Sequence, residues 1–268
     1  MTKTILGCGT LLFLFTLLAQ SSGSKKAVGP AADPASKDQI DELVLANRIL
    51  TNIGVLDAYG HVSVRSSKNP NHFFLSRHIP SGNVTASDII EYDLDTKPVY
   101  DTQMVGYSER FIHGEIYKAR PDVKAVIHGH APEIVTFSVT PLELRPIAHM
   151  AAFLSGGVPV FEIRKATQDG EMLIRSNELG HALAKTLGSR PAALMRGHGN
   201  VVVADSLHVV VGRAYYMNVN ARELIQALLL APGKVTYLQP NEMDKMAAQD
   251  GYERAWELWK QDVRLKRE

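Results

Sequence analysis

Residues 124–130 read KAVIHGH, an apolar and β-branched run that carries two histidines one residue apart. This composition predicts a strand. Side chains two positions apart on a strand point to the same face, so His128 and His130 are expected to project side by side while Gly129 faces away. Both imidazole rings can then reach one metal ion, at roughly 2.0 to 2.1 Å from each ligating nitrogen.

A third histidine lies at the end of another apolar strand, in the sequence RGHGN at residues 196–200. The glycines on both sides let the backbone turn sharply and bring His198 close to a neighbouring strand. Three neutral nitrogen ligands leave coordination positions open for a substrate, as in catalytic rather than structural sites. An HxH pair alone is a weak signal, because a histidine in an apolar run is usually a buried core residue, but the pair together with His198 favours a metal site.

The only cysteine of the chain and its charge balance narrow the chemistry further. Cys8 lies in the N-terminal segment, so the mature domain has no thiolate for a disulfide, a nucleophile or a zinc cluster. Any metal must therefore be held by His, Asp, Glu and water. The 268 residues carry 29 basic and 28 acidic side chains, a net charge of +1. This balance gives no basic field for nucleic acid, and a small-molecule substrate is expected instead.

The first 35 residues differ in composition from the rest of the chain. Residues 1–23 combine Lys3, an apolar run over residues 5–18 and small residues after it, which is the pattern of a signal peptide. The run is shorter than the about 20 residues of a membrane span, so cleavage and export are expected rather than a stable membrane anchor. The alternative is a wrongly assigned start codon and a cytoplasmic protein. Residues 24–35 are polar and proline-rich and predict a flexible lead.

Residues 36–268 are expected to form one domain in which helices and strands alternate. Ser36 and Gln39 predict a capping box for a helix that stops near Gly54. Ser108 is expected to cap a helix that ends near residue 119, and Pro132 to precede another. Further helical segments are expected at residues 176–187, 206–230 and 243–259, and strands at residues 61–65, 72–76, 88–93, 98–101, 124–130, 158–164 and 192–198, the last continuing into 200–204. This order predicts an α/β sandwich with one central, mostly antiparallel sheet flanked by helices.

Four short motifs follow one another along the chain: GHVS at residues 60–63, SERFIH at 108–113, HGH at 128–130 and GHG at 197–199. In this order they resemble the class II aldolase/adducin family, over about residues 36–230. The resemblance implies a single-domain class II aldolase-like sandwich. It also implies that His128, His130 and His198 hold a divalent ion, usually zinc, with manganese or iron as alternatives, and that Glu109 acts as acid or base beside it.

Three further residues have two interpretations each. Glu109 is the acid or base by resemblance, but the helix dipole also favours a carboxylate in a first turn. His113 follows one turn later on the same face, where it either orients Glu109 or fills the interface between helix and sheet.

Relatives are commonly homotetramers with sites between subunits, and the C-terminal helix often lends a tyrosine to its neighbour. Tyr252 is that tyrosine by position, or else it packs beside Trp256 and Trp259.

The chain departs from the sugar-phosphate aldolases at the positions that bind phosphate. His61 replaces an asparagine, Ser76 and Arg77 stand where a Thr-Pro-Ser-Gly loop is expected, and Tyr107 replaces a small hydroxyl residue before Ser108. These changes disfavour phosphate. Arg77 and His61 suit a carboxylate instead, because a guanidinium group pairs with it through two hydrogen bonds. We expect His61, Ser76, Arg77 and Ser108 to bind a small-molecule carboxylate.

Longer strings, among them HMAAFLSGGVPVFEIR at residues 149–164, look most like the branch of decarboxylases of 2-hydroxy-3-carboxymuconic semialdehyde and 3,4-dihydroxyphthalate. The resemblance implies a carbon–carbon lyase that decarboxylates an aromatic or muconic-type hydroxy or oxo acid through a metal-stabilised enolate. His149 falls near the position of a catalytic tyrosine of the aldolases and is expected to donate a proton. The alternatives are an aldolase or epimerase of a sugar or hydroxy acid, and a non-catalytic adducin-like scaffold. The retained histidines disfavour the scaffold.

Overall fold

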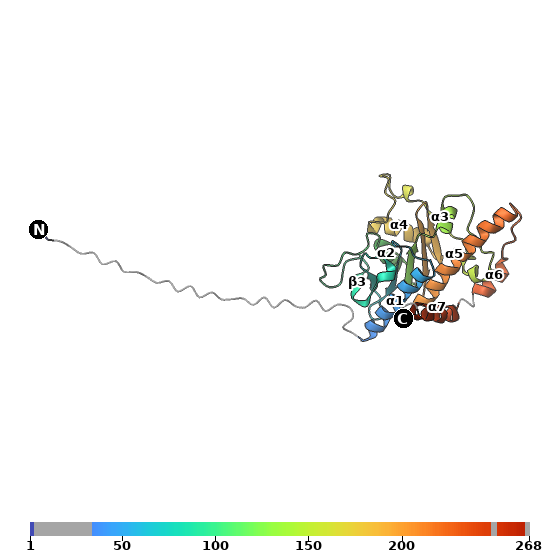
Figure 1. Cartoon of the computed structure of the whole chain (residues 1–268). Helices are drawn as coiled ribbons and strands as arrows, with labels where there is room; N and C mark the ends of the chain where they lie inside the picture. Colours follow the sequence, from blue (N-terminus) through green and yellow to red (C-terminus); the bar gives the residue numbers. More distant parts are fainter. Residues whose placement is uncertain (3–33, 248–250, 266–268) are drawn as a thin grey trace.

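The structure, a computed structural model, describes residues 1–2, 34–247 and 251–265 (Figure 1). Apart from residues 1, 2, 34 and 35, the expected signal peptide and flexible lead lie outside the described residues. Within the described part of the chain, no helix combines the length and the apolar character needed to cross a bilayer.

A seven-stranded sheet forms the centre of the domain, in the order β3-β2-β1-β4-β7-β6-β5. All neighbouring strands are antiparallel except β5 and β6, which are parallel. The expected mostly antiparallel sheet is therefore confirmed. The strands are β1 (His61–Arg65), β2 (His72–Ser76), β3 (Ile89–Asp93), β4 (Ala125–Gly129), β5 (Val160–Phe161), β6 (Ala192–Met195) and β7 (Gly199–Ala204).

Helices cover both faces of this sheet (Figure 1). One face packs against α1 (Pro34–Asn52), α3 (Pro132–Ser138), α5 (Leu207–Leu230) and α7 (Glu253–Leu265). The other face packs against α2 (Phe111–Ala119) and α4 (Asn177–Leu187). The short α6 (Pro240–Ala247) contacts the 3-10 turn η4 (His149–Leu154). Other 3-10 turns are η2 (Ser81–Asn83), η3 (Ala86–Asp88) and η5 (Ile163–Lys165).

The alternation of side chains along β1 divides apolar from polar residues. Val62 and Val64 pack into the core on the side of α1 and α5. Residues directly opposite one another in an antiparallel pair share a face. The register pairs His61 with His128 and Ser63 with Val126, so these four side chains point toward α2. The strand period thus brings two distant histidines together on one face.

The expected cap of the first helix is wrong. Since α1 begins at Pro34, Ser36 already lies inside the helix. The Gln39 side chain instead donates to the Arg65 carbonyl at 2.9 Å and accepts from the Ser67 N–H at 3.1 Å. It ties the helix to the loop after β1 rather than closing a capping box.

The expected cap of the second helix is also wrong. Residues 108–110 form a turn, and α2 begins only at Phe111 with Arg110 at the cap position and no side-chain cap. Ser108 does not cap this helix. Glu109 consequently lies in the turn before α2 and is not a first-turn carboxylate that the helix dipole alone explains.

Three expected strands and the C-terminal segment have different extents in the structure. Residues 98–101 contribute only an isolated bridge between Tyr92 and Pro98, since proline has no N–H for a ladder. The expected strand 158–164 reduces to β5, because the chain turns into η5 directly after it. Residues 192–204 form a hairpin, β6 and β7, with Gly197 at a φ of 63° in the turn. The amphipathic segment 243–259 belongs to two helices, α6 and α7.

Candidate metal centre

Three imidazoles and one carboxylate meet at the ends of β4 and β7 on the α2 side of the sheet. Each of Glu109, His128, His130 and His198 offers one ligand atom, and these atoms all lie within 4.8 Å of one another. The ring centroid of His128 is 4.6 Å from that of His130 and 4.9 Å from that of His198. The period of β4 and the β6–β7 turn therefore deliver the three histidines that the HxH and GHG motifs predict.

Hydrogen bonds to the other ring nitrogen fix how each imidazole is presented. Nδ1 of His128 donates to the Asn200 carbonyl at 3.0 Å, and Nδ1 of His198 donates to the Met172 carbonyl at 3.0 Å. Nδ1 of His130 lies 3.1 Å from a carboxylate oxygen of Asp57. Since all three Nδ1 atoms face acceptors, all three Nε2 atoms carry lone pairs when the rings are neutral, as in metal ligands.

The two lone pairs that face each other most closely indicate that a cation binds between them. Nε2 of His128 and Nε2 of His130 are only 2.9 Å apart. Neither nitrogen has a proton to donate when both Nδ1 atoms are protonated, so this approach is repulsive unless a cation lies near both. The donor set therefore fits a divalent ion with histidine ligands and an open position.

Glu109 adds a negative oxygen to this set. Its Oε1 accepts the Ile174 N–H at 2.8 Å, which leaves Oε2 at 3.4 Å from Nε2 of His198 and 3.7 Å from Nε2 of His128. Burial would raise the pKa of Glu109, but interaction with His128 and His198 outweighs it and holds the pKa well below its usual range. Without a metal this interaction requires a proton on the facing Nε2 atoms, the positions at which a metal ion would bind. The side chain is a carboxylate that can bind the ion or carry a proton beside it.

His113 lies behind His61 and does not hydrogen bond to Glu109. Its Nε2 is 2.7 Å from Nδ1 of His61, and its Nδ1 is 2.6 Å from Oγ of Ser63. Burial lowers the pKa of His113 to about 3. Burial, followed by the neighbouring imidazoles, also lowers the pKa of His61 well below its usual range. Both rings are therefore neutral. His113 fills the interface between helix and sheet, as one of its two interpretations has it, and its hydrogen bond goes to His61 rather than to Glu109.

A pocket of about 320 Å³ opens onto the metal-ligand cluster. Its wall contains His61, Ser108, Glu109, His130 and His198, all of which the sequence predicts as site residues. Sequence reasoning missed the remaining wall residues, which are Asp57, Tyr59, His78, Tyr107 and Leu173. One local signal marks Asp57: it stands three residues before Gly60, and its carboxylate accepts the Tyr59 and Gly60 N–H groups at 2.9 and 2.8 Å.

Two residues expected to bind substrate lie outside the wall of this pocket. The Arg77 guanidinium donates to the Asp88 carboxylate at 2.6 Å. The Ser76 hydroxyl is fully buried and donates to the Tyr107 hydroxyl at 3.3 Å. The structure therefore brings neither side chain to the pocket, and the polar groups that face a substrate come from its wall residues.

His149 and Tyr252 lie in a different part of the same subunit. Both line a cavity of about 200 Å³ whose wall contains none of the four metal-ligand residues. The Tyr252 hydroxyl donates to the Met150 carbonyl at 3.2 Å, and its ring stacks on Tyr216 at 5.5 Å. Within one subunit, the structure does not bring either residue to the cluster. Their expected catalytic roles are not met by a single chain.

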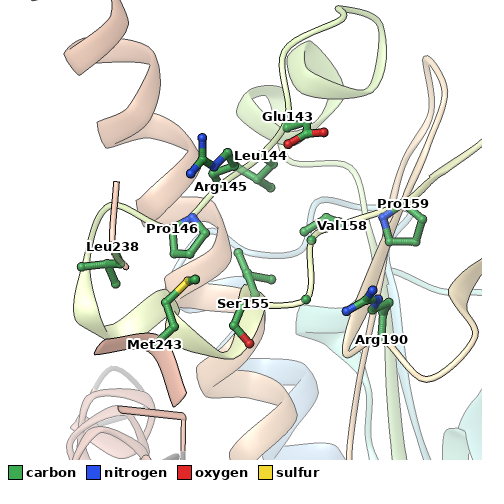
Figure 2. A pocket seen from close by; sticks show the side chains of 13 residues that line it. Glu143, Leu144, Arg145, Pro146, Ser155, Val158, Pro159, Arg190, Leu238 and Met243 are labelled. Carbon is green, nitrogen blue, oxygen red and sulfur yellow. The ribbon is translucent and has the colours of Figure 1, made fainter. Parts of the chain in front are cut away.

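A larger cavity, of about 490 Å³, lies between the loop at residues 143–159 and the C-terminal residues Leu238 and Met243 (Figure 2). Among the residues that the structure describes, its charged wall residues are Glu143, Arg145 and Arg190, and none of its wall residues is a histidine. Imidazole ligands for a metal are thus found in the smaller pocket, not in this cavity. The chemistry of the chain is best sought where the histidines meet.

The sequence matches the Class II Aldolase and Adducin N-terminal domain over residues 41–225. It is 35% identical over 239 residues to "Decarboxylase tropJ" from Talaromyces stipitatus, which covers 80% of this chain and 90% of that protein. It is 29% identical over 239 residues to a 3,4-dihydroxyphthalate decarboxylase from Arthrobacter keyseri, with 83% and 92% coverage. A match to β-adducin from Rattus norvegicus, 28% identical, covers 72% of this chain but only 27% of that protein.

The fold has matching solved structures. An aldolase II superfamily protein from Pseudomonas syringae aligns with a TM-score of 0.74 at 21% identity, covering 87% of this chain and 95% of that chain. An L-fuculose 1-phosphate aldolase from Glaciozyma antarctica aligns with a TM-score of 0.62 at 22% identity, covering 84% and 86%. At these identities the likeness shows the shared fold, which agrees with the central sheet and its two helical layers.

Proposed function

Because this chain belongs to the class II aldolase and adducin family, and two relatives that match over at least 80% of both chains are decarboxylases, we propose that it decarboxylates an aromatic or muconic-type hydroxy or oxo acid. One observation carries the proposal. The Glu109, His128, His130 and His198 cluster lies beside a pocket, with every Nε2 lone pair available to a metal. A scaffold without chemistry has no need of that arrangement.

Bond cleavage requires a place for negative charge. A divalent ion held by these donors would stabilise charge that develops on a substrate oxygen as the carbon–carbon bond breaks. His61 and Ser108 line the same pocket and offer hydrogen-bond donors to the carboxylate or hydroxyl groups of the substrate. The expected contact from Arg77 is replaced by these wall residues, since Arg77 is paired with Asp88.

Glu109 can move the proton that the reaction needs. As a carboxylate, its Oε2 can accept the proton of a substrate hydroxyl, while the Ile174 N–H holds Oε1 in place. Glu109 then gives this proton to the carbon that bears the carboxylate, which makes the substrate a β-oxo acid and returns Glu109 to a carboxylate. When the carboxyl group leaves as carbon dioxide, the electron pair of the broken bond passes to the substrate oxygen as an enolate, which regains a proton from water.

The second candidate is an aldolase or epimerase, because the same cluster and Glu109 also suit removal of a proton beside a carbonyl group. The replacements around His61 and Tyr107 argue against a phosphate, and two relatives that match over at least 80% of both chains are named as decarboxylases. The two reactions differ in their products: carbon dioxide in the first, and an aldehyde with a ketone, or an epimer, in the second.

Substrate screening tests the proposal. The purified protein, supplied in turn with zinc, manganese and ferrous iron, is incubated with 3,4-dihydroxyphthalate, related hydroxybenzoates and muconic semialdehyde acids, and carbon dioxide release is measured. We expect release from at least one acid, and its loss in Glu109→Gln. Cleavage of sugar phosphates or hydroxy acids without carbon dioxide would support the second candidate. No turnover by any metal form would favour the scaffold.

Three finer features belong to this proposal. We propose zinc as the native ion because the ligands are mainly imidazoles, and elemental analysis of protein from unsupplemented cells tests this. We propose a homotetramer in which a neighbour brings His149 or Tyr252 to the site, and light scattering tests the assembly. We propose export on the signal pattern of residues 1–23, and N-terminal sequencing of protein from the cell exterior tests the cleavage.

A further inference from the structure

Behind the pocket, four buried polar side chains form a continuous hydrogen-bonded line. It runs from His61 to His113 at 2.7 Å, from His113 to the Ser63 hydroxyl at 2.6 Å, and from Ser63 to the Tyr117 hydroxyl at 2.8 Å. None of the four side chains is more than 2% exposed. His61 and Ser63 share a face of β1 two residues apart, and His113 and Tyr117 share a face of α2 one turn apart, so the two elements build the line between them.

Tyr117 determines the direction in which the hydrogen bonds of this line are donated. Burial raises the pKa of Tyr117, so the hydroxyl keeps its single proton. Two acceptors lie within reach: the Ser63 hydroxyl at 2.8 Å and the Lys124 carbonyl at 3.4 Å. The Lys124 carbonyl already accepts the Arg65 N–H at 2.7 Å. The shorter contact and the occupied carbonyl together favour donation from Tyr117 to Ser63.

Each later donor follows from this first one. Ser63 uses a lone pair to accept from Tyr117, so its own proton is directed to Nδ1 of His113 at 2.6 Å. A neutral imidazole has one N–H, so His113 carries it on Nε2 and donates to Nδ1 of His61 at 2.7 Å. The proton of His61 is then on Nε2, the nitrogen that the hydrogen bond to His113 leaves for the pocket wall.

We propose that Ser63, His113 and Tyr117 are positioning residues that hold His61 as its Nε2–H tautomer, so that His61 presents a fixed, neutral hydrogen-bond donor to a substrate carboxylate or oxo oxygen. The substrate class rests on the proposed function. The tautomer rests only on the buried line. A neutral donor also adds no positive charge next to the cluster, where the His61 ring lies 5.1 Å from that of His128.

Nitrogen-15 NMR of the zinc-loaded protein in the solid state tests the tautomer directly. Protonated and unprotonated ring nitrogens give well-separated signals, and the signals of His61 and His113 are assigned from spectra of His61→Asn and His113→Asn. We expect both rings to carry one proton, on Nε2. A proton on Nδ1 of His61, or on both of its nitrogens, would overturn the proposal.

Ser63→Ala provides the functional test, because it removes the donor to His113 and leaves every metal-ligand residue intact. We expect signals from both tautomers of His61, zinc content equal to that of the wild type, and kcat/KM lower by about tenfold, the effect of one misdirected hydrogen bond. Ser66→Ala is the matched control, since Ser66 is also buried but contacts Asn69 instead of His113. It should keep the single tautomer and the wild-type kcat/KM.

The possible outcomes separate this inference from the proposed function. An unchanged His61 tautomer in Ser63→Ala contradicts the role of the line, whatever the enzyme catalyses. A wild-type protein that decarboxylates none of the tested acids contradicts the proposed function, while its NMR spectrum still decides the tautomer. Equal losses of zinc and activity in Ser63→Ala and Ser66→Ala would show that buried serines matter only for folding, and would also overturn the inference.

Discussion

A carboxylate oxygen of Asp57 lies 3.1 Å from Nδ1 of His130, although 73 residues separate the two in the chain. The same oxygen accepts the Tyr59 and Gly60 N–H groups. Burial would raise the pKa of Asp57, but the hydrogen bonds from His130 and from these backbone groups lower it. A carboxylate held in this way orients the His130 ring so that the Nε2 lone pair points to the cluster. It also raises the basicity of that nitrogen.

Asp57→Asn should weaken metal binding. The amide oxygen can still accept the turn N–H groups, but the negative charge that supports His130 is lost. We expect the dissociation constant for zinc to rise by about 10- to 100-fold, as is typical when a partner of a ligating histidine is replaced. Competition with a chromogenic chelator measures it. Asp93→Asn is the control, because Asp93 likewise accepts a backbone N–H, that of Lys97, but at the edge strand. Equal affinity in both variants would contradict the role of Asp57.

The sequence predicts the metal-ligand residues better than the residues that hydrogen bond to them and hold them in place. His128 and His130 follow from the strand period, and the glycines around His198 indicate its turn. Asp57 escapes prediction because its contact depends on the pairing of β1 with β4, which places the loop before β1 beside His130. The periodicity of the local sequence does not predict which strands pair, so it does not predict this contact.

Arg77 and His149 do not reach the pocket within one subunit, and the physical cause is the same for both. Arg77 is assigned to a carboxylate by charge alone, but Asp88, eleven residues later, satisfies it within the subunit. His149 is assigned by its distance along the chain from His130, yet η4 and α6 pack together on the far side of the sheet from α2. Charge and spacing identify what a residue can do, whereas tertiary packing decides which partner it meets.

His128→Ala should remove the metal. His128 is fully buried and central to the cluster, with both other imidazoles within 4.9 Å between ring centroids. We expect the metal-to-protein ratio after dialysis to fall from near one to near zero, together with all activity. His181→Ala is the control, as its side chain is 72% exposed. Wild-type metal content in His128→Ala would rule out the proposed centre.

Gly199→Ala should distort the centre without removing a ligand. A Cβ atom at Gly199 would lie 2.1 Å from the Gly129 carbonyl oxygen, so β4 and β7 would have to separate where they carry His130 and His198. We expect the zinc affinity to fall by about 10-fold or more, which is the effect of losing a contact that supports a metal ligand. In Gly129→Ala the nearest atom would be 3.4 Å away, an ordinary contact, and binding should be near normal. Similar affinities in the two variants would contradict the close approach.

Leu75→Ala should destabilise the fold strongly. Leu75 on β2 is fully buried between the sheet and α2, so its truncation leaves a cavity. We expect a loss of about 2 to 5 kcal/mol in the free energy of unfolding, measured with urea. The same change at Leu230, which is 86% exposed at the end of α5, should cost within about 0.5 kcal/mol. A loss at Leu75 as small as that at Leu230 would place β2 outside the core.

Acid should destabilise the metal-free protein in a window that His113 defines. Burial holds the pKa of His113 at about 3, against 6.5 in the unfolded chain. Between these values the unfolded state binds more protons than the folded state, so the free energy of unfolding falls as pH is lowered from about 6.5 toward 3. The slope from this residue is at most about 1.4 kcal/mol per pH unit. Urea titrations at several pH values, in chelator, should show a smaller slope for His113→Gln than for the wild type. Glutamine cannot titrate. An equal slope in the two proteins would therefore show that proton uptake by His113 on unfolding does not cause the loss of stability in acid.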